Sequence, residues 1–293
     1  MNEELPVIDA HHHLWRLSGG PLYYPWLQDA RPHEFFLGEY ATLKRDYLPA
    51  DYRRDSAGHN VVKTVHVEAE CRRDQQVAET RWLTEMNAHS GMPRAIVAHA
   101  WFHTANAEEI FAQQKSYSMV RGIRCKPTSG GEGSMQDPKW LAGLRLLRKF
   151  DLSWDLRVPT WQLEEAAQVV RAIPDIPVVL NHTGFPWDRS AEGLALWRRG
   201  MQALAASGQV NCKLSCLCLQ AGPWDYEDNR RIVLEAIDIF GIDRCMFASN
   251  FPVDGLRVPF DRMFQDFKRM TAALSASDRR KLFHDNAARF YRL

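Results

Sequence analysis

The sequence predicts an α/β protein whose eight parallel strands close into a (β/α)8 TIM barrel, a single domain over residues 1–293. Three observations lead to this prediction. Eight short apolar runs recur along the chain, amphipathic stretches of helical length separate them, and polar residues gather where the runs end. A doubly wound open sheet is the alternative that the same alternation allows.

The predicted strands are short runs rich in apolar and β-branched residues. In chain order they are residues 6–13, 61–70, 94–103, 120–127, 153–159, 177–184, 210–217 and 244–252. Amphipathic stretches that predict helices cover residues 74–90, 137–150, 160–173 and 225–240. Two of these stretches begin with capping residues: Asp137 precedes Pro138, and Thr160 is followed by Glu164.

Two connections are unusual. Residues 14–60 far exceed the roughly 2–6 residues of a typical strand–helix loop, so we expect this long segment after the first strand to fold over the barrel mouth. Its aromatic residues Tyr23, Tyr24 and Trp26 either contact substrate or pack the segment itself. The run TSGGEGS at 128–134 lacks the Gly-Lys-Ser/Thr ending of a phosphate-binding loop, so it predicts a lid or a plain connector. We expect no organic cofactor.

The charge balance favours a small-molecule partner. Lys and Arg number 37 against 36 Asp and Glu, a net charge of +1, which offers no general attraction for nucleic acid or a membrane. No run approaches ~20 consecutive apolar residues and the first residues are acidic, so we expect a cytoplasmic protein, with homo-oligomerisation left open. The six cysteines lie mostly in apolar runs, which predicts reduced core thiols.

Polar residues at the ends of the predicted strands mark the candidate site, because the functional groups of such barrels lie there. Strand alternation predicts which side chains face the interior. In the second strand, Val65 and Val67 suit the helix-facing side, which leaves the alternate positions inward. The predicted interior set is Asp9, His11, His13, His66, Glu68, Glu70, Arg124, Lys126, Asp155, Arg157, His182, Lys213, Ser215 and Asn250. His12, on the opposite parity, is expected to pack or to lie at the surface.

The histidines of this set suit two kinds of chemistry. His11, His13 and His182 could converge on a divalent metal, zinc or manganese, or on a substrate carbonyl and its attacking water, because neutral imidazole serves as ligand, base or hydrogen-bond donor. His66, His99 and His103 are expected to be core or rim residues.

The cations of this set suit an anionic group. Arg124, Arg157 and Lys213 could cradle a carboxylate or a developing oxyanion, which predicts a small substrate that is anionic or polyhydroxylated. Two alternatives stay open: the arginines could instead pair with Asp155 or Glu68 in a polar core, and Glu68 and Glu70 could be structural partners rather than substrate ligands.

Several motifs along the whole chain together resemble the amidohydrolase superfamily, in its amidohydrolase-related branch of sugar lactonases and pyrone-dicarboxylate lactonases. They are DAHHHLW, YPWL, VHVEA, RGIR, LNHTGFP, CKLS, ASNFP and NAARFYRL. The resemblance implies a barrel whose water attacks a cyclic ester, with a metal that is weakly bound or absent. It assigns His11 and His13 to the family's strand-one pair, His182 to its strand-six histidine and Arg124 to a substrate-orienting cation.

One position departs from that family. The strand-eight residue is usually an aspartate that acts as general base and, in metal-dependent members, as a ligand, but here it is Asn250. An amide does not accept a proton near neutral pH and is a poor metal ligand. Asp254, four residues on, could substitute if its loop turns inward, and His182 and Glu68 are the other candidates for the base.

Hydrolysis of a small lactone, from a sugar acid or of the pyrone-dicarboxylate type, is the leading hypothesis. His11, His13 and His182 would polarise the reacting centre or activate water, and Asn250 would hold that water. Arg124, Arg157 and Lys213 would orient the substrate, with Glu68, Tyr24 and Trp26 completing the predicted binding residues. The alternatives are a metal-dependent decarboxylase of the same superfamily and a catalytically decayed barrel that binds a small molecule.

Overall fold

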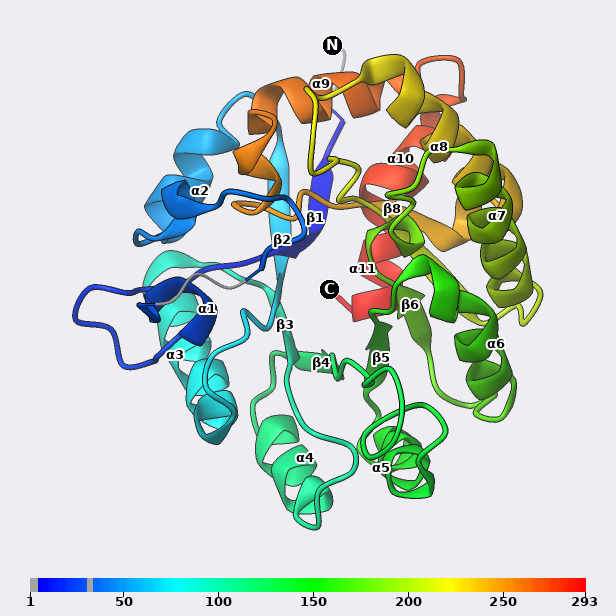
Figure 1. Cartoon of the computed structure of the whole chain (residues 1–293). Helices are drawn as coiled ribbons and strands as arrows, with labels where there is room; N and C mark the ends of the chain where they lie inside the picture. Colours follow the sequence, from blue (N-terminus) through cyan, green and yellow to red (C-terminus); the bar gives the residue numbers. More distant parts are fainter. Residues whose placement is uncertain (1–4, 31–33) are drawn as a thin grey trace.

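The chain folds as a (β/α)8 barrel in a computed structural model that describes residues 5–30 and 34–293. Eight strands pair in parallel in the order β1 to β8, and the helices surround them (Figure 1). The strands are β1 Val7–His12, β2 Val61–Val67, β3 Ala95–Ala98, β4 Val120–Ile123, β5 Ser153–Leu156, β6 Val178–Leu180, β7 Val210–Leu214 and β8 Cys245–Phe247. The predicted fold is confirmed, although every predicted strand ends earlier than expected because its last residues turn towards the barrel mouth.

Backbone hydrogen bonds between β1 and the segment after β8 close the barrel. The amide of Asn250 donates to the carbonyl of His11 at 2.8 Å, and the amide of His13 donates to the carbonyl of Phe251 at 2.8 Å. The first histidine pair and Asn250 are therefore held on adjacent strand ends, next to one another across the seam.

The helices follow the amphipathic stretches. They are α1 Pro25–Gln28, α2 Pro49–Asp55, α3 Gln76–Ser90, α4 Ala107–Lys115, α5 Pro138–Lys149, α6 Leu163–Arg171, α7 Ala191–Ala205, α8 Tyr226–Phe240, α9 Phe260–Met270, α10 Ala276–Arg280 and α11 Asn286–Tyr291. Asp137 caps α5 as predicted, since its side chain accepts from the amide of Lys139 at 2.9 Å. The Thr160 cap is wrong: α6 begins at Leu163, and the Thr160 hydroxyl donates to the carbonyls of Gly184 and Phe185. None of the described helices is long and apolar enough to span a bilayer.

The two unusual connections have different roles. Residues 14–60 contain α1, α2 and a short 3-10 turn, Ala41–Leu43, so this segment carries secondary structure of its own. The 128–134 run closes on itself, with the amide of Thr128 donating to the carbonyl of Gly133 at 3.0 Å. It does not line the main cavity, so nothing in its position makes it a lid over that cavity.

Two apolar layers lie on the two faces of the strands. Ile96, Ile123, Leu180 and Phe247 belong to the large outer cluster that packs against the helices. A smaller interior cluster joins strand residues to the last helix: Ile8, Ala10, Val65, Val67, Ala95, Val97, Val179, Met246, Ala248, Ala287 and Tyr291. In Figure 1 α11 and the C-terminus lie at the centre of the ring of strands.

The predicted strand parity is wrong at two residues, His66 and Asp9. Val65 and Val67 face the interior, so His66 lies on the outer side, where its ring is 5.6 Å from that of His12. Asp9 is also outside the interior, because its carboxylate accepts from the hydroxyl of Tyr52 on α2 at 2.7 Å. A register shift between Asp9 and His12 reverses the alternation, so strict period-two counting fails there.

The six cysteines are all buried and free, as predicted for core thiols. His12, also buried, packs 4.8 Å from the ring of Tyr52, which confirms its packing role.

Candidate active site

A cavity of about 340 Å³ lies where the carboxyl ends of the strands meet. Four residues at these ends adopt the left-handed conformation that side chains with a Cβ rarely occupy: Glu70, His182, Cys216 and Asn250, at φ of 53° to 59°. Such strain costs roughly 1–3 kcal/mol per residue and concentrates at functional sites. The cavity is lined by His13, Trp26, Glu34, Phe35, Phe36, Ala69, Glu70, Arg124, Lys126, Arg157, His182, Asn250 and Val253.

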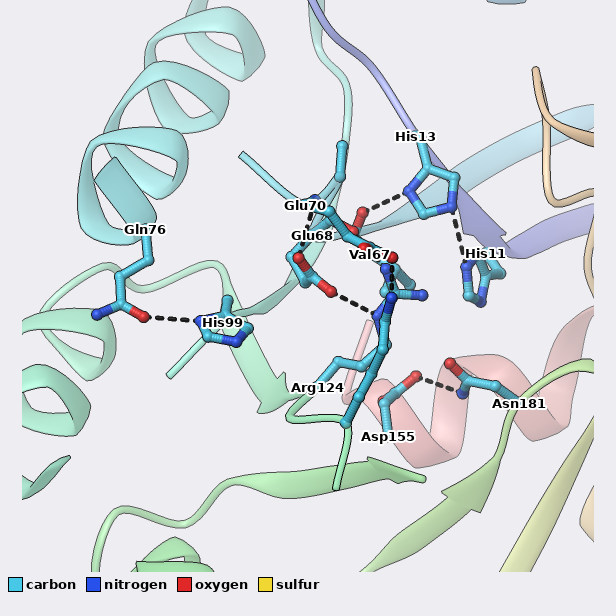
Figure 2. Close-up of polar contacts among 12 residues, drawn as sticks. His11, His13, Val67, Glu68, Glu70, Gln76, His99, Arg124, Asp155 and Asn181 are labelled. Atoms are coloured by element: carbon cyan, nitrogen blue, oxygen red, sulfur yellow. Dashed lines mark hydrogen bonds and ion pairs between the residues drawn. The ribbon is translucent and has the colours of Figure 1, made fainter. Parts of the chain in front are cut away.

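His13, just after β1, lines one wall of the cavity, whereas His11 lies behind it and is not part of the lining. The hydrogen bonds of these two histidines determine their tautomers. Nδ1 of His13 lies 2.7 Å from the carbonyl of Val67, so it must carry the proton and donate. Burial lowers the pKa of His13 to about 3, so the ring is neutral and its Nε2 is an acceptor. Nε2 of His11, 3.3 Å away, is therefore the donor of that pair (Figure 2).

A buried ion pair lies behind His11. Nζ of Lys213 donates to Oδ2 of Asp155 at 2.6 Å and lies 3.4 Å from Nδ1 of His11, which accepts because its other nitrogen holds the proton. Asn181 and Tyr291 also donate to Asp155, at 3.0 and 3.2 Å. Burial, then the Lys213 charge, holds the pKa of His11 well below its usual range. Lys213 thus supports His11 and does not line the cavity.

His182 follows β6 and faces the same space. Its ring centroid is 4.4 Å from that of His11, and its Nδ1 lies 3.1 Å from the hydroxyl of Ser215. Nε2 is therefore the ring nitrogen left for a ligand. Burial, followed by the charges of Arg157 and Arg124, lowers the pKa of His182 well below its usual range, so this histidine is also neutral.

The opposite wall holds three cations in different states of pairing. Nε of Arg124 donates to Oε1 of Glu68 at 2.8 Å, and Lys126 pairs with Glu70. Arg157 makes neither an ion pair nor a hydrogen bond with its side chain among the described residues; its guanidinium lies 5.1 Å from the ring of Phe185. The open alternative is thus decided residue by residue: Arg124 pairs with Glu68, whereas Arg157 is left for a ligand.

The carboxylates of this wall are ionised. Burial alone would raise the pKa of Glu68, but Arg124 and Arg73 hold it well below its usual range. Burial would also raise the pKa of Glu70, but the nearby charge of Lys126 outweighs it and lowers this pKa to about 2. Burial and Arg157 lower the pKa of Lys126 to about 8, so this amine is a weaker cation than a surface lysine. Glu68 therefore acts as a structural partner of Arg124 rather than as a free base.

Aromatic side chains from the long segment after β1 form the roof. Trp26 and Phe35 stack with ring centroids 5.6 Å apart and an interplanar angle of 5°. Nε1 of Trp26 donates to the carbonyl of Ala69 at 2.9 Å, which fixes the roof to the end of β2. Phe36 extends the roof towards Trp187. The prediction that this segment covers the barrel mouth is confirmed.

Not every predicted site residue reaches the cavity. Tyr24 is fully buried in the outer apolar core, and its hydroxyl has no hydrogen-bond partner among the described residues. Asp254 lies one layer behind the lining, where its Oδ1 accepts from Nδ2 of Asn250 at 2.9 Å. The sequence reasoning missed Phe35 and Phe36 as lining residues, although an aromatic pair inside a segment expected to cover the mouth was the available signal.

The histidines fit a metal ion only in part. The 3.3 Å between Nε2 of His11 and Nε2 of His13 suits two ligands of one tetrahedral zinc. Lys213, however, offers a donor to Nδ1 of His11, where a metal-bound imidazole needs an acceptor, and Asn250 replaces a carboxylate ligand. Within residues 5–30 and 34–293 no group of three His, Cys, Asp or Glu residues is arranged to hold a metal. This donor set does not fit a resident metal, and no step below involves one.

Comparison with known proteins gives a consistent picture. The family model described as Amidohydrolase matches residues 8–293. The chain is 37% identical to the uncharacterized protein y4mH of Sinorhizobium fredii, over 99% of each protein. It is 28% identical to an L-fucono-1,5-lactonase of Burkholderia multivorans, over 98% of this chain and 96% of that protein.

The solved structures agree with this picture. A crystal structure of an amidohydrolase from Burkholderia multivorans with bound zinc is 27% identical, with a TM-score of 0.82, over 98% of this chain and 99% of that one.

Proposed function

The chain belongs to the amidohydrolase family and is a hydrolase of that superfamily, and from this premise we propose that it opens a small lactone by attack of water. The proposed substrate carries a carboxylate or several hydroxyl groups, as in a sugar-acid lactone or a pyrone dicarboxylate. The relative named L-fucono-1,5-lactonase supports the reaction class. A decarboxylase would need a firmly held metal, and the donor set described above does not favour it.

One observation carries the proposal: the Arg157 guanidinium, which makes no ion pair or hydrogen bond within residues 5–30 and 34–293, shares one cavity with the neutral histidines His13 and His182. An unpaired guanidinium in a poorly hydrated site is costly, and a carboxylate or hydroxyl group of a ligand would compensate it. His182 and His13, both neutral, lie where the rest of such a ligand would lie. The cavity thus combines an anchor for an anionic or hydroxylated group with groups that bind a carbonyl and a water.

The proposed reaction uses these groups in fixed roles. Water attacks the lactone carbonyl carbon, the ring C–O bond breaks, and the products form one hydroxy acid. Nε2 of His182 takes the water proton and returns it to the departing oxygen. The guanidinium groups of Arg124 and Arg157, which line the cavity, stabilise the charge that develops on the carbonyl oxygen. A neutral imidazole of low pKa is a weak base, which suffices because a lactone is a reactive ester.

Two features of the cavity indicate which classes of substrate it could bind. The planar Trp26–Phe35 stack suits the flat ring of a pyrone, and the two guanidinium groups of Arg124 and Arg157, which line the same cavity, suit two carboxylates. The hydroxyl groups of a sugar lactone would use the same cations and Glu70 as hydrogen-bond partners. Both substrate types therefore belong in the test.

The test is hydrolysis of a panel of sugar lactones and pyrone dicarboxylates by the wild type and by His182→Asn. We expect kcat/KM for at least one substrate to fall by about 10²–10⁴-fold in the variant, the usual contribution of a general base. His89→Asn, a change at an exposed histidine of α3, is the matched control and should leave the rate unchanged. Equal rates for the wild type and His182→Asn on every substrate would refute the proposal.

A further inference from the structure

We propose that Asp254 is a positioning residue that fixes the side-chain amide of Asn250 with its carbonyl oxygen towards the attacking water. This inference rests on the proposed function of the cavity. It gives a role to a buried carboxyl group that touches no part of the cavity and to the amide that occupies the strand-eight position.

The backbone after β8 brings the two side chains together. Asn250 adopts φ of 53°, and its backbone N–H donates a hydrogen bond to the carbonyl of His11. The chain then turns, and the amide of Asp254 donates to the carbonyl of Asn250 at 3.2 Å. This turn folds Asp254, whose exposed fraction is 0%, beneath Asn250, while Asn250 lines the cavity.

The hydrogen bond between the side chains selects one orientation of the amide. Nδ2 of Asn250 donates to Oδ1 of Asp254 at 2.9 Å. An ionised carboxylate accepts hydrogen bonds and donates none, so it requires the NH2 end of the amide on its own side. Oδ1 of Asn250 makes no hydrogen bond among the described residues and is left towards the cavity. The water next to it then meets an acceptor.

The protonation state of Asp254 controls this orientation. Burial raises the pKa of Asp254 to about 7, and hydrogen bonding from Asn250 and Cys216 opposes part of that rise. The titratable groups that face Asp254 are the thiols of Cys216 and Cys218, whose pKa values burial raises, so they stay neutral around pH 7.

Protonation of Asp254 changes which orientation of the Asn250 side-chain amide the hydrogen bond between them allows. A protonated Asp254 gains an O–H that can donate to the carbonyl oxygen of Asn250. It then no longer requires the NH2 end of the amide on its own side, and the amide can turn that end towards the cavity. Above pH 7 the ionised carboxylate therefore keeps an acceptor towards the cavity at this position, and below pH 7 this constraint is lost and a donor can face the cavity. Only the acceptor takes a hydrogen of the water and leaves the water's lone pair free to attack the lactone carbonyl.

This arrangement explains why an amide serves better than a carboxylate here. In Asn250→Asp two carboxyl groups would lie about as close as the present 2.9 Å contact, and groups so close share one proton. The pair would titrate together, and the water would often meet a protonated oxygen. We therefore expect Asn250→Asp to lose activity rather than to gain it.

The decisive experiment uses the whole protein without substrate. Side-chain amide resonances of 15N-labelled asparagine are followed from pH 5 to pH 9 in the wild type, Asp254→Asn and Asp266→Asn, with Asn250 assigned by its absence in Asn250→Asp. Asp266 is the matched control because it is a buried aspartate on α9 that pairs with Arg262, away from the cavity. We expect the Asn250 amide to titrate near pH 7 in the wild type and in Asp266→Asn, and not in Asp254→Asn.

Kinetics provide the second readout. In the wild type kcat should rise with pH through about 7, and Asp254→Asn should lose this rise with kcat lowered about tenfold or more and KM changed less than about threefold. The proposal would be overturned if the Asn250 side-chain amide resonances of the wild type did not change with pH. It would also be overturned if Asp254→Asn folded and its kcat still rose with pH through about 7. If no lactone is hydrolysed the proposed function fails, while the resonance titration still decides the role of Asp254, even if Asp254→Asn does not fold.

Discussion

Arg157 provides the sharpest test of how the cavity holds its ligand. Replacing Arg157 by Met removes a guanidinium that lies 5.1 Å from the ring of Phe185 and makes no ion pair or hydrogen bond among the described residues. Because burial already lowers the pKa of Arg157, its charge is poorly solvated in the free protein. We expect Arg157→Met to fold with unchanged or slightly higher stability and to lose affinity for carboxylate-bearing substrates.

The magnitude follows from the hydrogen bonds that Arg157 would make. A hydrogen bond to a charged group contributes about 1.5–3 kcal/mol, which corresponds to roughly 10–150-fold in KM. Arg124→Met differs in kind, since it leaves the carboxylate of Glu68 buried with Arg73 as its nearest remaining cation. Breaking a buried pair in this way costs about 3–5 kcal/mol of folding free energy, so Arg124→Met should unfold at clearly lower denaturant.

The assay compares initial rates on a pyrone dicarboxylate and on its dimethyl ester, together with urea unfolding. For Arg157→Met, KM should rise for the dicarboxylate and change little for the uncharged ester, while the unfolding midpoint stays at or above the wild-type value. Exposed Arg199→Met serves as the control for removal of a positive charge. An equal loss on both substrates, or a large loss of stability in Arg157→Met, would refute the assignment of Arg157 to a substrate carboxylate.

Three further predictions concern stability and metal. Asp155→Asn should lower the free energy of unfolding by about 3–5 kcal/mol, because Lys213 would stay buried without its carboxylate. Urea unfolding measures this loss, and an unchanged free energy of unfolding would show that Lys213 is neutral. Burial lowers the pKa of His66 to about 3, so its contribution to stability is complete above the unfolded pKa of about 6.5 and falls as pH drops below it. Below pH 6.5 the fall of wild-type stability should exceed that of His66→Gln by about 1.4 kcal/mol per pH unit, and identical slopes would contradict a neutral buried ring. Calorimetric titration with zinc should show binding weaker than about 1 μM, and a bound stoichiometric zinc on purification would overturn our interpretation of the donor set.

Much of the fold was predictable because strand–helix alternation is a local property. Each strand needed only its own apolar residues, and helix α5 needed only Asp137 and Pro138 to mark its start. Parity counting failed at His66, whose neighbours Val65 and Val67 face the interior, and at Asp9, after which a register shift interrupts the alternation of β1.

The residues of the candidate site were also predictable in part. His11, His13, His182, Arg157 and Asn250 could be picked from the sequence, because polar residues at the ends of apolar runs are rare and a barrel gathers those ends in one place. The sequence alone thus determined the fold class, the family resemblance and the chemical types that meet at the mouth. The partners were decided by tertiary structure alone. Arg124 is neutralised by Glu68, and Lys213 pairs with Asp155 and supports His11 from behind. These contacts depend on distances of 2.6 to 3.4 Å between residues 56 to 202 positions apart. No local pattern encodes such distances, because closure of the barrel sets them.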